Sequence, residues 1–320
     1  MIKGKNILIT GGGGFIGTNL AKVLIEQNKI TALDNGTRDA LKYTGLEQHP
    51  NFTLVKGDVL DKERMMELVK GKRIILHLAA IAGISSYERF PLKTMEVNLL
   101  GTHNMLAAAA KEKPELFLNF STSEVYGPYA KDVNEQSNTQ QGPVGEKRWT
   151  YSVSKLAAEH FGFAFFYEHN LRFTSIRPFN IYGPGQVGEG AIQQFAKRAL
   201  NGEDLIVNGK GDQVRSWCYI DDLVKAVLLM LENRKAIGKT FVIGNPKATV
   251  TVKELAEKIV ELTKSKSKIR FSPQLKADVQ LRIPDITKAK KLLGFEPEIQ
   301  LEEGLKRTIE WYKSVEGNGQ

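Results

Sequence analysis

The sequence is poor in cysteine: Cys218 is the only one among 320 residues. A single thiol excludes an intrachain disulfide and is typical of a protein from a reducing compartment. The sequence also lacks any apolar run near the roughly 20 residues that a membrane-spanning helix needs. Its first residues lead directly into a strand-like run, so we expect no signal peptide and a cytoplasmic location.

Signs of a metal site or of a nucleic-acid interface are also missing from the sequence. The five histidines show no metal-ligand spacing, and we interpret them as structural. The net charge of +9 comes from Lys and Arg residues scattered along the chain, without a zinc-finger or RNA-binding motif. We therefore favour a solvated basic surface over nucleic-acid binding, and the same positive field would steer a phosphorylated substrate.

Apolar, strand-like runs alternate with helical patterns through most of the chain. The strand-like runs cover residues 6–10, 30–34, 52–55, 73–78, 116–121, 174–178 and 240–243. The helical patterns between them cover residues 18–27, 62–69, 92–111, 151–169 and 221–232. This alternation predicts an α/β fold, namely a doubly wound parallel sheet with helices on both faces.

The pattern loosens after residue 180. A glycine-rich loop is followed by helical patterns over residues 191–201, 252–263, 286–293 and 301–313. We therefore predict a large sheet domain and a smaller, interleaved C-terminal lid. The sheet domain is expected to comprise residues 1–180 and 215–245, and the lid residues 181–214 and 246–320.

A run of glycines follows the first strand-like run and opens the first helical pattern. Both Gly12-x-Gly14-x-x-Gly17 and Gly11-x-x-Gly14-x-x-Gly17 can be read in it. Glycines let a pyrophosphate approach the backbone, and N–H groups at the start of a helix bind its charge. Asp34 ends the second run at the distance expected of an acid that accepts hydrogen bonds from a ribose. Such an acid would repel a 2′-phosphate, so the sequence favours NAD over NADP, although Arg38 lies nearby.

Two further groups of residues suggest chemistry. Tyr151 and Lys155 lie four residues apart in a helical pattern and therefore share one face. The Lys155 ammonium and a cationic nicotinamide ring would both lower the pKa of Tyr151, which could then take a proton from a sugar hydroxyl. The stretch Phe120–Gly127 begins as a strand and then presents the side chains of Thr122 and Glu124. They lie at the carboxyl end of the strand, where open parallel sheets bind ligands.

Together these motifs resemble the extended short-chain dehydrogenase/reductases, the branch that contains nucleotide-sugar epimerases, dehydratases and decarboxylases. The resemblance covers nearly the whole chain. It includes Thr10–Gly17, Leu33–Asn35, Gly57–Val59, His77–Ala80, Asn98, Phe120–Gly127, Tyr151-x-x-x-Lys155, Arg177–Gly185 and Arg282–Ile286. It implies a Rossmann sheet with a small substrate lid, and an enzyme that transiently oxidises a sugar, usually at C4, with bound NAD⁺.

The resemblance also implies roles for individual residues. NAD would be held by Gly11, Gly14, Phe15, Ile16, Gly17, Asp34, Asn35, Asp58, Val59, Leu78, Ala79, Ala80, Asn98, Tyr151 and Lys155. Asn180, Arg215 and Arg282 match positions that in relatives hold the sugar and nucleotide diphosphate of the substrate. Thr122 matches the hydroxyl that hydrogen-bonds the reacting oxygen beside Tyr151. The helical segments 92–111 and 151–169 resemble those that pair in relatives, so we expect a homodimer.

Glu124 is the residue that bears on the reaction after C4 oxidation, and the resemblance does not fix which reaction this is. The Thr-Ser-Glu motif resembles 4,6-dehydratases of the GDP-mannose type, in which the Glu removes the C5 proton. UDP-glucuronate decarboxylases have Ser-Thr-Ser-Glu as well, and the Arg282–Ile286 motif looks more like theirs. The Tyr151–Lys155 motif and the Gln186–Gly190 loop, in contrast, look more like those of epimerases and dehydratases. Dehydratases of the dTDP-glucose type use Asp-Glu, whereas Ser123 stands here in place of the Asp. Glu124 would then have both to remove the proton and to protonate the departing water.

From the sequence we hypothesise an NAD-dependent 4,6-dehydratase, a lyase, that acts on a UDP-hexose or UDP-N-acetylhexosamine. A UDP-glucuronate-type decarboxylase, a 4-epimerase and a net C4 dehydrogenase are alternatives of the same fold. A non-catalytic nucleotide sensor is an alternative of a different class. The presence of Thr122, Tyr151 and Lys155 disfavours a sensor, which need not retain all three.

Overall fold

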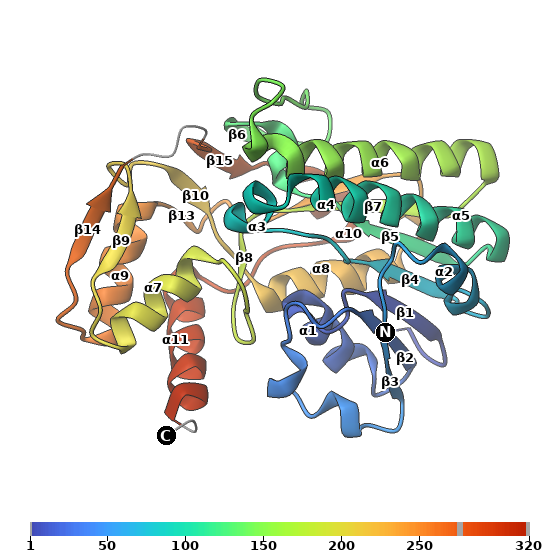
Figure 1. The fold of residues 1–320 in the computed structure, drawn as a ribbon, viewed down its shortest axis with the longest axis horizontal. Helices are drawn as coiled ribbons and strands as arrows, with labels where there is room; N and C mark the ends of the chain where they lie inside the picture. The colour runs from blue at the N-terminus through green and yellow to red at the C-terminus, as the bar shows by residue number, and fades with distance from the viewer. Residues whose placement is uncertain (1, 274–277, 318–320) are drawn as a thin grey trace.

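The computed structural model describes residues 2–273 and 278–317. At its centre lies a seven-stranded sheet in the order β12-β7-β5-β4-β1-β2-β3, and every pairing in it is parallel (Figure 1). Its strands are β1 (Asn6–Thr10), β2 (Lys29–Asp34), β3 (Phe52–Lys56), β4 (Ile74–His77), β5 (Leu116–Phe120), β7 (Phe173–Pro178) and β12 (Thr240–Ile243). The predicted α/β fold with a parallel sheet is confirmed.

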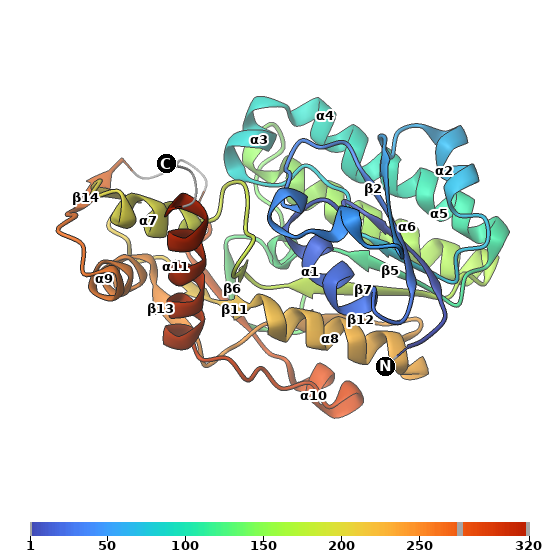
Figure 2. The same ribbon diagram turned by 90° about the horizontal axis from the view of Figure 1, so that it is seen from below.

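Helices cover both faces of this sheet, as Figures 1 and 2 show. One face carries α1 (Phe15–Leu24) and α8 (Ile220–Glu232); the other carries α2 (Lys62–Leu68), α5 (Thr102–Glu112) and α6 (Thr150–His169). The central strands are therefore buried on both sides, and they consist of continuous apolar residues rather than an alternation. In the part of the chain that the structure describes, no helix is long and apolar enough to cross a membrane.

A smaller lobe lies beside the sheet, on the left in Figure 1. Its four-stranded sheet has the order β13 (Thr249–Thr251), β10 (Val214–Ser216), β15 (Leu281–Pro284) and β6 (Tyr129–Val133). The pairs β8 (Ile181–Tyr182) with β11 (Cys218–Tyr219) and β9 (Leu205–Asn208) with β14 (Ile269–Ser272) complete its strands. Its helices are α7 (Ala191–Leu200), α9 (Val252–Thr263) and α11 (Leu301–Gly317), while α10 (Thr287–Leu293) packs beside β12.

The segment 92–111, predicted as a single helix, is interrupted. A stretch of π-helix, η3 (Glu96–Gly101), joins α4 (Pro91–Met95) to α5. Within η3, Gly101 lies so close to Val59 that a Cβ on it would be 2.4 Å from the Val59 Cγ2. Asn98, in the same stretch, is buried and donates to the Ser154 Oγ over 3.1 Å. Short π-helical stretches are frequent at functional sites, and the hydrogen bond from Asn98 to Ser154 connects this stretch to α6.

Candidate active site

The glycine run forms the turn between β1 and α1. Gly11 has a φ of +69°, and a Cβ there would lie 2.9 Å from the Ala79 backbone nitrogen. A Cβ on Gly17 would lie 2.4 Å from the Gly11 carbonyl oxygen, so a side chain at either position would force the turn away from its neighbours. Among the described residues no side chain caps α1. The N–H groups of its first turn, around Phe15 and Ile16, are therefore suited to bind an anion.

Asp34 lies at the carboxyl end of β2, next to the glycine turn. Its Oδ2 accepts from the Gly13 N–H over 2.9 Å, and its Oδ1 accepts from the Gly36 N–H over 2.8 Å. These two bonds fix the carboxylate at the edge of the turn, where a ribose diol would donate to it. Asn35 follows on the exposed surface, and its side chain accepts from the Thr37 N–H.

The other residues predicted to hold NAD lie at the ends of β3 and β4. Asp58 follows β3 and accepts from the Leu60 N–H over 3.0 Å, and Val59 beside it is buried. Leu78, Ala79 and Ala80 follow β4 directly and are half-buried. Asn98 holds the next residue of this loop, because its side chain accepts from the Ile81 N–H and donates to the Ile81 carbonyl.

Thr122, Tyr151 and Lys155 meet at the carboxyl end of β5. Tyr151 and Lys155 are one turn apart on α6, and Lys155 is almost completely buried. The Thr122 hydroxyl lies near enough to Tyr151 to lower the pKa of its phenol. The Tyr151 ring stacks on the Tyr87 ring, with ring centroids 5.7 Å apart and an interplanar angle of 11°. The structure therefore brings the predicted hydroxyl, phenol and ammonium together.

Glu124 is the centre of a group of buried charges beside these residues. Two nitrogens of Arg148, Nη1 and Nη2, donate to its carboxylate over 2.6 and 3.1 Å. Arg282 Nη1 lies 3.5 Å from the Glu124 Oε1. The pairing of β10 with β15 sets Arg215 opposite Arg282, and Arg215 forms an ion pair with Asp278 at 3.6 Å.

Asn180, the remaining residue predicted to bind substrate, lies between β7 and β8. It has a φ of +40°, and its side-chain amide donates to the Ser216 carbonyl over 2.9 Å. In this conformation it connects the main sheet to β10, the strand that carries Arg215.

Comparisons with known proteins agree with this geometry. Residues 7–244 match the model of the NAD dependent epimerase/dehydratase family. The chain belongs to this family. It is 35% identical to a UDP-N-acetyl-alpha-D-glucosaminuronate decarboxylase of Bacillus cytotoxicus, over 98% of this chain and 99% of that one. It is 36% identical to UDP-glucuronic acid decarboxylase 1 of Danio rerio, over 96% of this chain and 72% of that one.

A solved structure of another relative contains the cofactor. The UDP-glucuronic acid 4-epimerase of Bacillus cereus, in complex with UDP-glucuronic acid and NAD, has a TM-score of 0.89 and 27% identity, covering 97% of this chain and 99% of that one. The protein is accordingly an NAD-dependent enzyme that modifies nucleotide sugars. The predicted family and cofactor are confirmed.

The residues at the glycine turn fit NAD. The turn presents helix N–H groups and no side chain to a pyrophosphate, and the Asp34 carboxylate lies where a ribose would donate. Bound there, NAD would supply a hydride acceptor. Tyr151 and Lys155 lie in the first two turns of α6.

Burial sets the proton affinities of Lys155 and Tyr151. It lowers the pKa of Lys155 to about 8, against a smaller opposing effect of the Glu159 carboxylate. It also raises the pKa of Tyr151 to about 12, an effect that the negative charge of Glu124 increases and the Thr122 hydroxyl reduces. Tyr151 is therefore a neutral phenol in the nucleotide-free protein, and a nearby positive charge is needed to make it a base.

The opposite balance holds at Glu124. Burial alone would raise the pKa of this carboxyl, but the guanidinium groups of Arg148 and Arg282 outweigh burial and hold the pKa below its usual range. Burial and the neighbouring Arg282 lower the pKa of Arg215 to about 10, so Arg215 remains charged near neutral pH. Glu124 is consequently an ionised carboxylate inside a cluster of cations.

Three residues of this site were missed in the sequence analysis. Arg148 and Tyr87 contact Glu124 and Tyr151, but nothing in their local spacing indicates either contact. Glu189, in the glycine-rich loop before α7, accepts from the Ser86 hydroxyl over 2.6 Å and pairs with Arg38 at 3.2 Å. Through these two contacts Glu189 connects its loop to the short helix Ile84–Arg89 and to the segment that follows Asp34.

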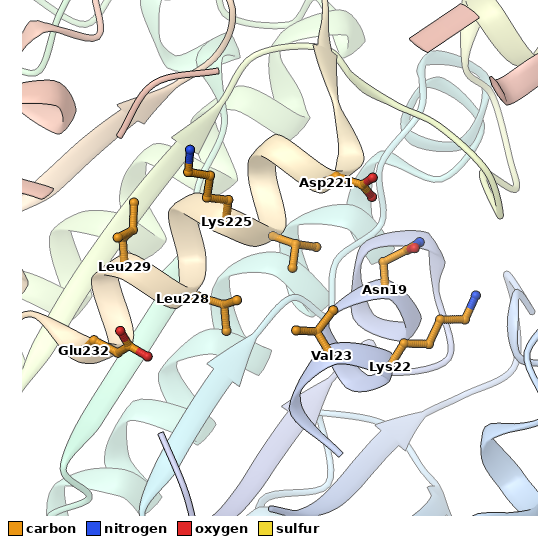
Figure 3. A pocket seen from close by; sticks show the side chains of 9 residues that line it. Asn19, Lys22, Val23, Asp221, Lys225, Leu228, Leu229 and Glu232 are labelled. Carbon is orange, nitrogen blue, oxygen red and sulfur yellow. The ribbon is translucent and has the colours of Figure 1, made fainter. Parts of the chain in front are cut away.

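A separate groove lies between α1 and α8, with a volume of about 640 Å³ (Figure 3). It is lined by Asn19, Lys22 and Val23 of α1 and by residues of α8 that include Asp221, Lys225, Leu228 and Leu229. None of the catalytic side chains lines this groove. It is therefore distinct from the active site.

Proposed function

We propose that the protein decarboxylates a UDP-linked hexuronate through transient oxidation at C4. The observation that carries this proposal is the ionised Glu124 between Arg148 and Arg282, with Arg215 beside them. Within this cluster three guanidinium groups face two carboxylates, Glu124 and Asp278, so it carries an excess of positive charge. The diphosphate of any nucleotide sugar would bring negative charge to this cluster, and a carboxylate at C5 would add one more negative charge, which a neutral hexose lacks.

The first step is common to all the reactions considered for this chain. Tyr151 removes the proton of the C4 hydroxyl, assisted by the Thr122 hydroxyl, while hydride leaves C4 for the bound cofactor. The positive charges of Lys155 and of the oxidised nicotinamide lower the pKa of Tyr151 from its high value in the nucleotide-free protein. The product of this step is a 4-ketone.

The second step follows from the position of the new ketone. A carboxylate at C5 is then β to a carbonyl, so the bond from C5 to the carboxyl carbon can break and its electron pair can form an enolate. CO₂ leaves, C5 takes up one proton, and the hydride returns to C4. In total one CO₂ is released and one proton is consumed, and no acid is needed to assist a leaving group.

Glu124 is poorly suited to the acid–base chemistry that dehydration needs. A dehydratase needs a base to remove the C5 proton and an acid to protonate the departing hydroxyl, and Ser123 cannot supply the acid. A carboxylate whose pKa is held low by two guanidinium groups is a weak base for a carbon-bound proton. Our proposal therefore departs from the dehydratase hypothesis at this step, and it agrees with the names of the relatives that are 35% and 36% identical.

The experiment is to incubate the protein with UDP-glucuronate, UDP-N-acetylglucosaminuronate, UDP-glucose and UDP-N-acetylglucosamine and to weigh the products. We expect loss of CO₂ from a uronate and no change in the neutral sugars. Loss of water from a neutral sugar would instead establish the dehydratase. An isomer of unchanged mass would establish a 4-epimerase, and loss of two hydrogens a dehydrogenase.

We also propose a cytoplasmic homodimer formed through the outer face of α4, α5 and α6. Leu92, Leu100, Phe161 and Tyr167 are exposed along this part of the molecule. Large apolar side chains gathered on one surface are typical of an interface. Light scattering during size-exclusion chromatography should give twice the mass of the chain, and a monomer at micromolar concentration would contradict the proposal. The cytoplasmic location rests on the single cysteine.

A further inference from the structure

Arg148 connects the two parts of the active site. Its guanidinium group forms two hydrogen bonds to Glu124, and its Cζ lies 5.4 Å from the centroid of the Tyr87 ring. The Tyr87 ring in turn stacks on the Tyr151 ring. A cation above one ring of a stacked pair favours a fixed position for both.

We propose that Arg148 is a positioning residue of this active site, which holds the carboxylate of Glu124 directly and the phenol of Tyr151 through the ring of Tyr87. The link to Glu124 rests on the proposed function, in which the ionised Glu124 belongs to the charged cluster that would receive the C5 carboxylate. The link to Tyr151 concerns the oxidation of C4, which precedes every alternative second step. The two links can therefore be tested separately.

The hydrogen bonding of Arg148 and Tyr87 favours a functional role of Arg148 over a stabilising one. Within the described part of the chain, the Arg148 Nε and the Tyr87 hydroxyl are buried and have no hydrogen-bond partner. Each buried, unpaired polar group destabilises a folded protein. A buried ion pair, moreover, is often no more stabilising than apolar side chains of similar volume. Stability alone therefore gives little reason for a cation here, whereas positioning of Glu124 and Tyr151 does.

The charged and titratable groups around Glu124 determine what loss of Arg148 would do. They are Arg148 from the segment before α6, Arg282 from β15, Arg215 from β10 with its partner Asp278, Tyr87 from α3 (Ile84–Arg89) and Tyr151 from α6. Without Arg148, the nearest remaining cation to Glu124 would be Arg282, at 3.5 Å. The effect of burial on Glu124 would then be less fully offset by positive charge, and the pKa of Glu124 would rise.

The test compares Arg148→Met, Arg148→Lys and Tyr87→Leu. Single-turnover formation of reduced NAD measures C4 oxidation, and kcat and KM are measured across pH. We expect Arg148→Met to slow C4 oxidation and kcat by about 10- to 100-fold, with little change in KM, because misplaced catalytic groups cost rate rather than affinity. We also expect the acidic limb of its kcat profile to move to higher pH.

The other variants separate charge from geometry. Arg148→Lys should restore the acidic limb but only part of the rate, since an ammonium cannot bind a carboxylate with two parallel hydrogen bonds. Tyr87→Leu should slow C4 oxidation without moving the limb, because it leaves the Arg148–Glu124 pair in place. Arg73→Met removes another ion pair, Arg73–Glu115, at the opposite end of the strands, and should change neither quantity.

Two results would overturn the proposal. One is an Arg148→Met enzyme with wild-type C4 oxidation and an unmoved acidic limb. The other is a rise in KM with unchanged kcat, which would make Arg148 a substrate-binding residue. If Arg148→Met does not fold, Arg148→Lys and Tyr87→Leu carry the same test. C4 oxidation can be measured whatever the second step is, so failure of the decarboxylase proposal would be recognised separately from the product masses.

Discussion

Replacement of Lys155 by Met should stabilise the folded protein while it abolishes catalysis. Lys155 is 2% exposed and has a pKa of about 8 instead of its ordinary 10.5, chiefly because burial disfavours the ammonium. At about 1.4 kcal/mol per pH unit, this difference means that a charged Lys155 destabilises the folded protein by roughly 3 kcal/mol. Met keeps most of the volume of the side chain and carries no charge, so it should recover an amount of this order near pH 7.

The stability difference between the wild type and Lys155→Met should depend on pH. Between pH 8 and 10.5 the folded protein has released the Lys155 proton while the unfolded chain still holds it. The unfolded state then binds more protons than the folded state, so the free energy of unfolding of the wild type rises with pH. The advantage of Lys155→Met should be fully present below about pH 8 and should disappear as pH approaches 10.5.

Urea unfolding of NAD-free protein from pH 7 to 10.5 measures this difference. Lys147→Met is the matched control, because Lys147 is exposed just before α6 and its loss should change stability by no more than about 0.5 kcal/mol. A difference between wild type and Lys155→Met that stays constant over this range would refute the reasoning. So would a Lys155→Met protein that is less stable than the wild type at pH 7.

Three further predictions concern the cofactor and the catalytic base. Tyr151→Phe should abolish turnover and leave NAD affinity, measured by calorimetry, nearly unchanged; undiminished turnover would remove Tyr151 from the mechanism. Asp34→Asn should weaken NAD binding by about 10-fold or more, because hydrogen bonds to a charged acceptor are lost, and equal affinity would contradict the role of Asp34. Glu189→Gln should speed NAD dissociation in stopped-flow measurements by about 2- to 5-fold, since a partly exposed ion pair to Arg38 contributes little more. An unchanged rate would show that this pair does not restrain the cofactor.

The local features of this protein could be predicted from sequence because each depends on residues close together in the chain. The alternation of apolar runs and helical patterns predicted the parallel sheet. The spacing of Tyr151 and Lys155 placed both on one helix face, and the glycine run together with Asp34 predicted NAD. In each case the chemistry follows from backbone geometry that a few neighbouring residues impose.

The residues around Glu124 could not be found in this way. Arg148 is brought to Glu124 by the path of the chain into α6, and Arg282 by the pairing of β15 with β6 and β10. Neither contact has a sequence spacing that identifies it, and the protonation state of Glu124 depends on both. The sequence therefore determined the fold and the cofactor, and it predicted the residues of the proposed first chemical step. The tertiary structure decided the charge on Glu124, because burial and ion pairing act between residues that only folding brings together.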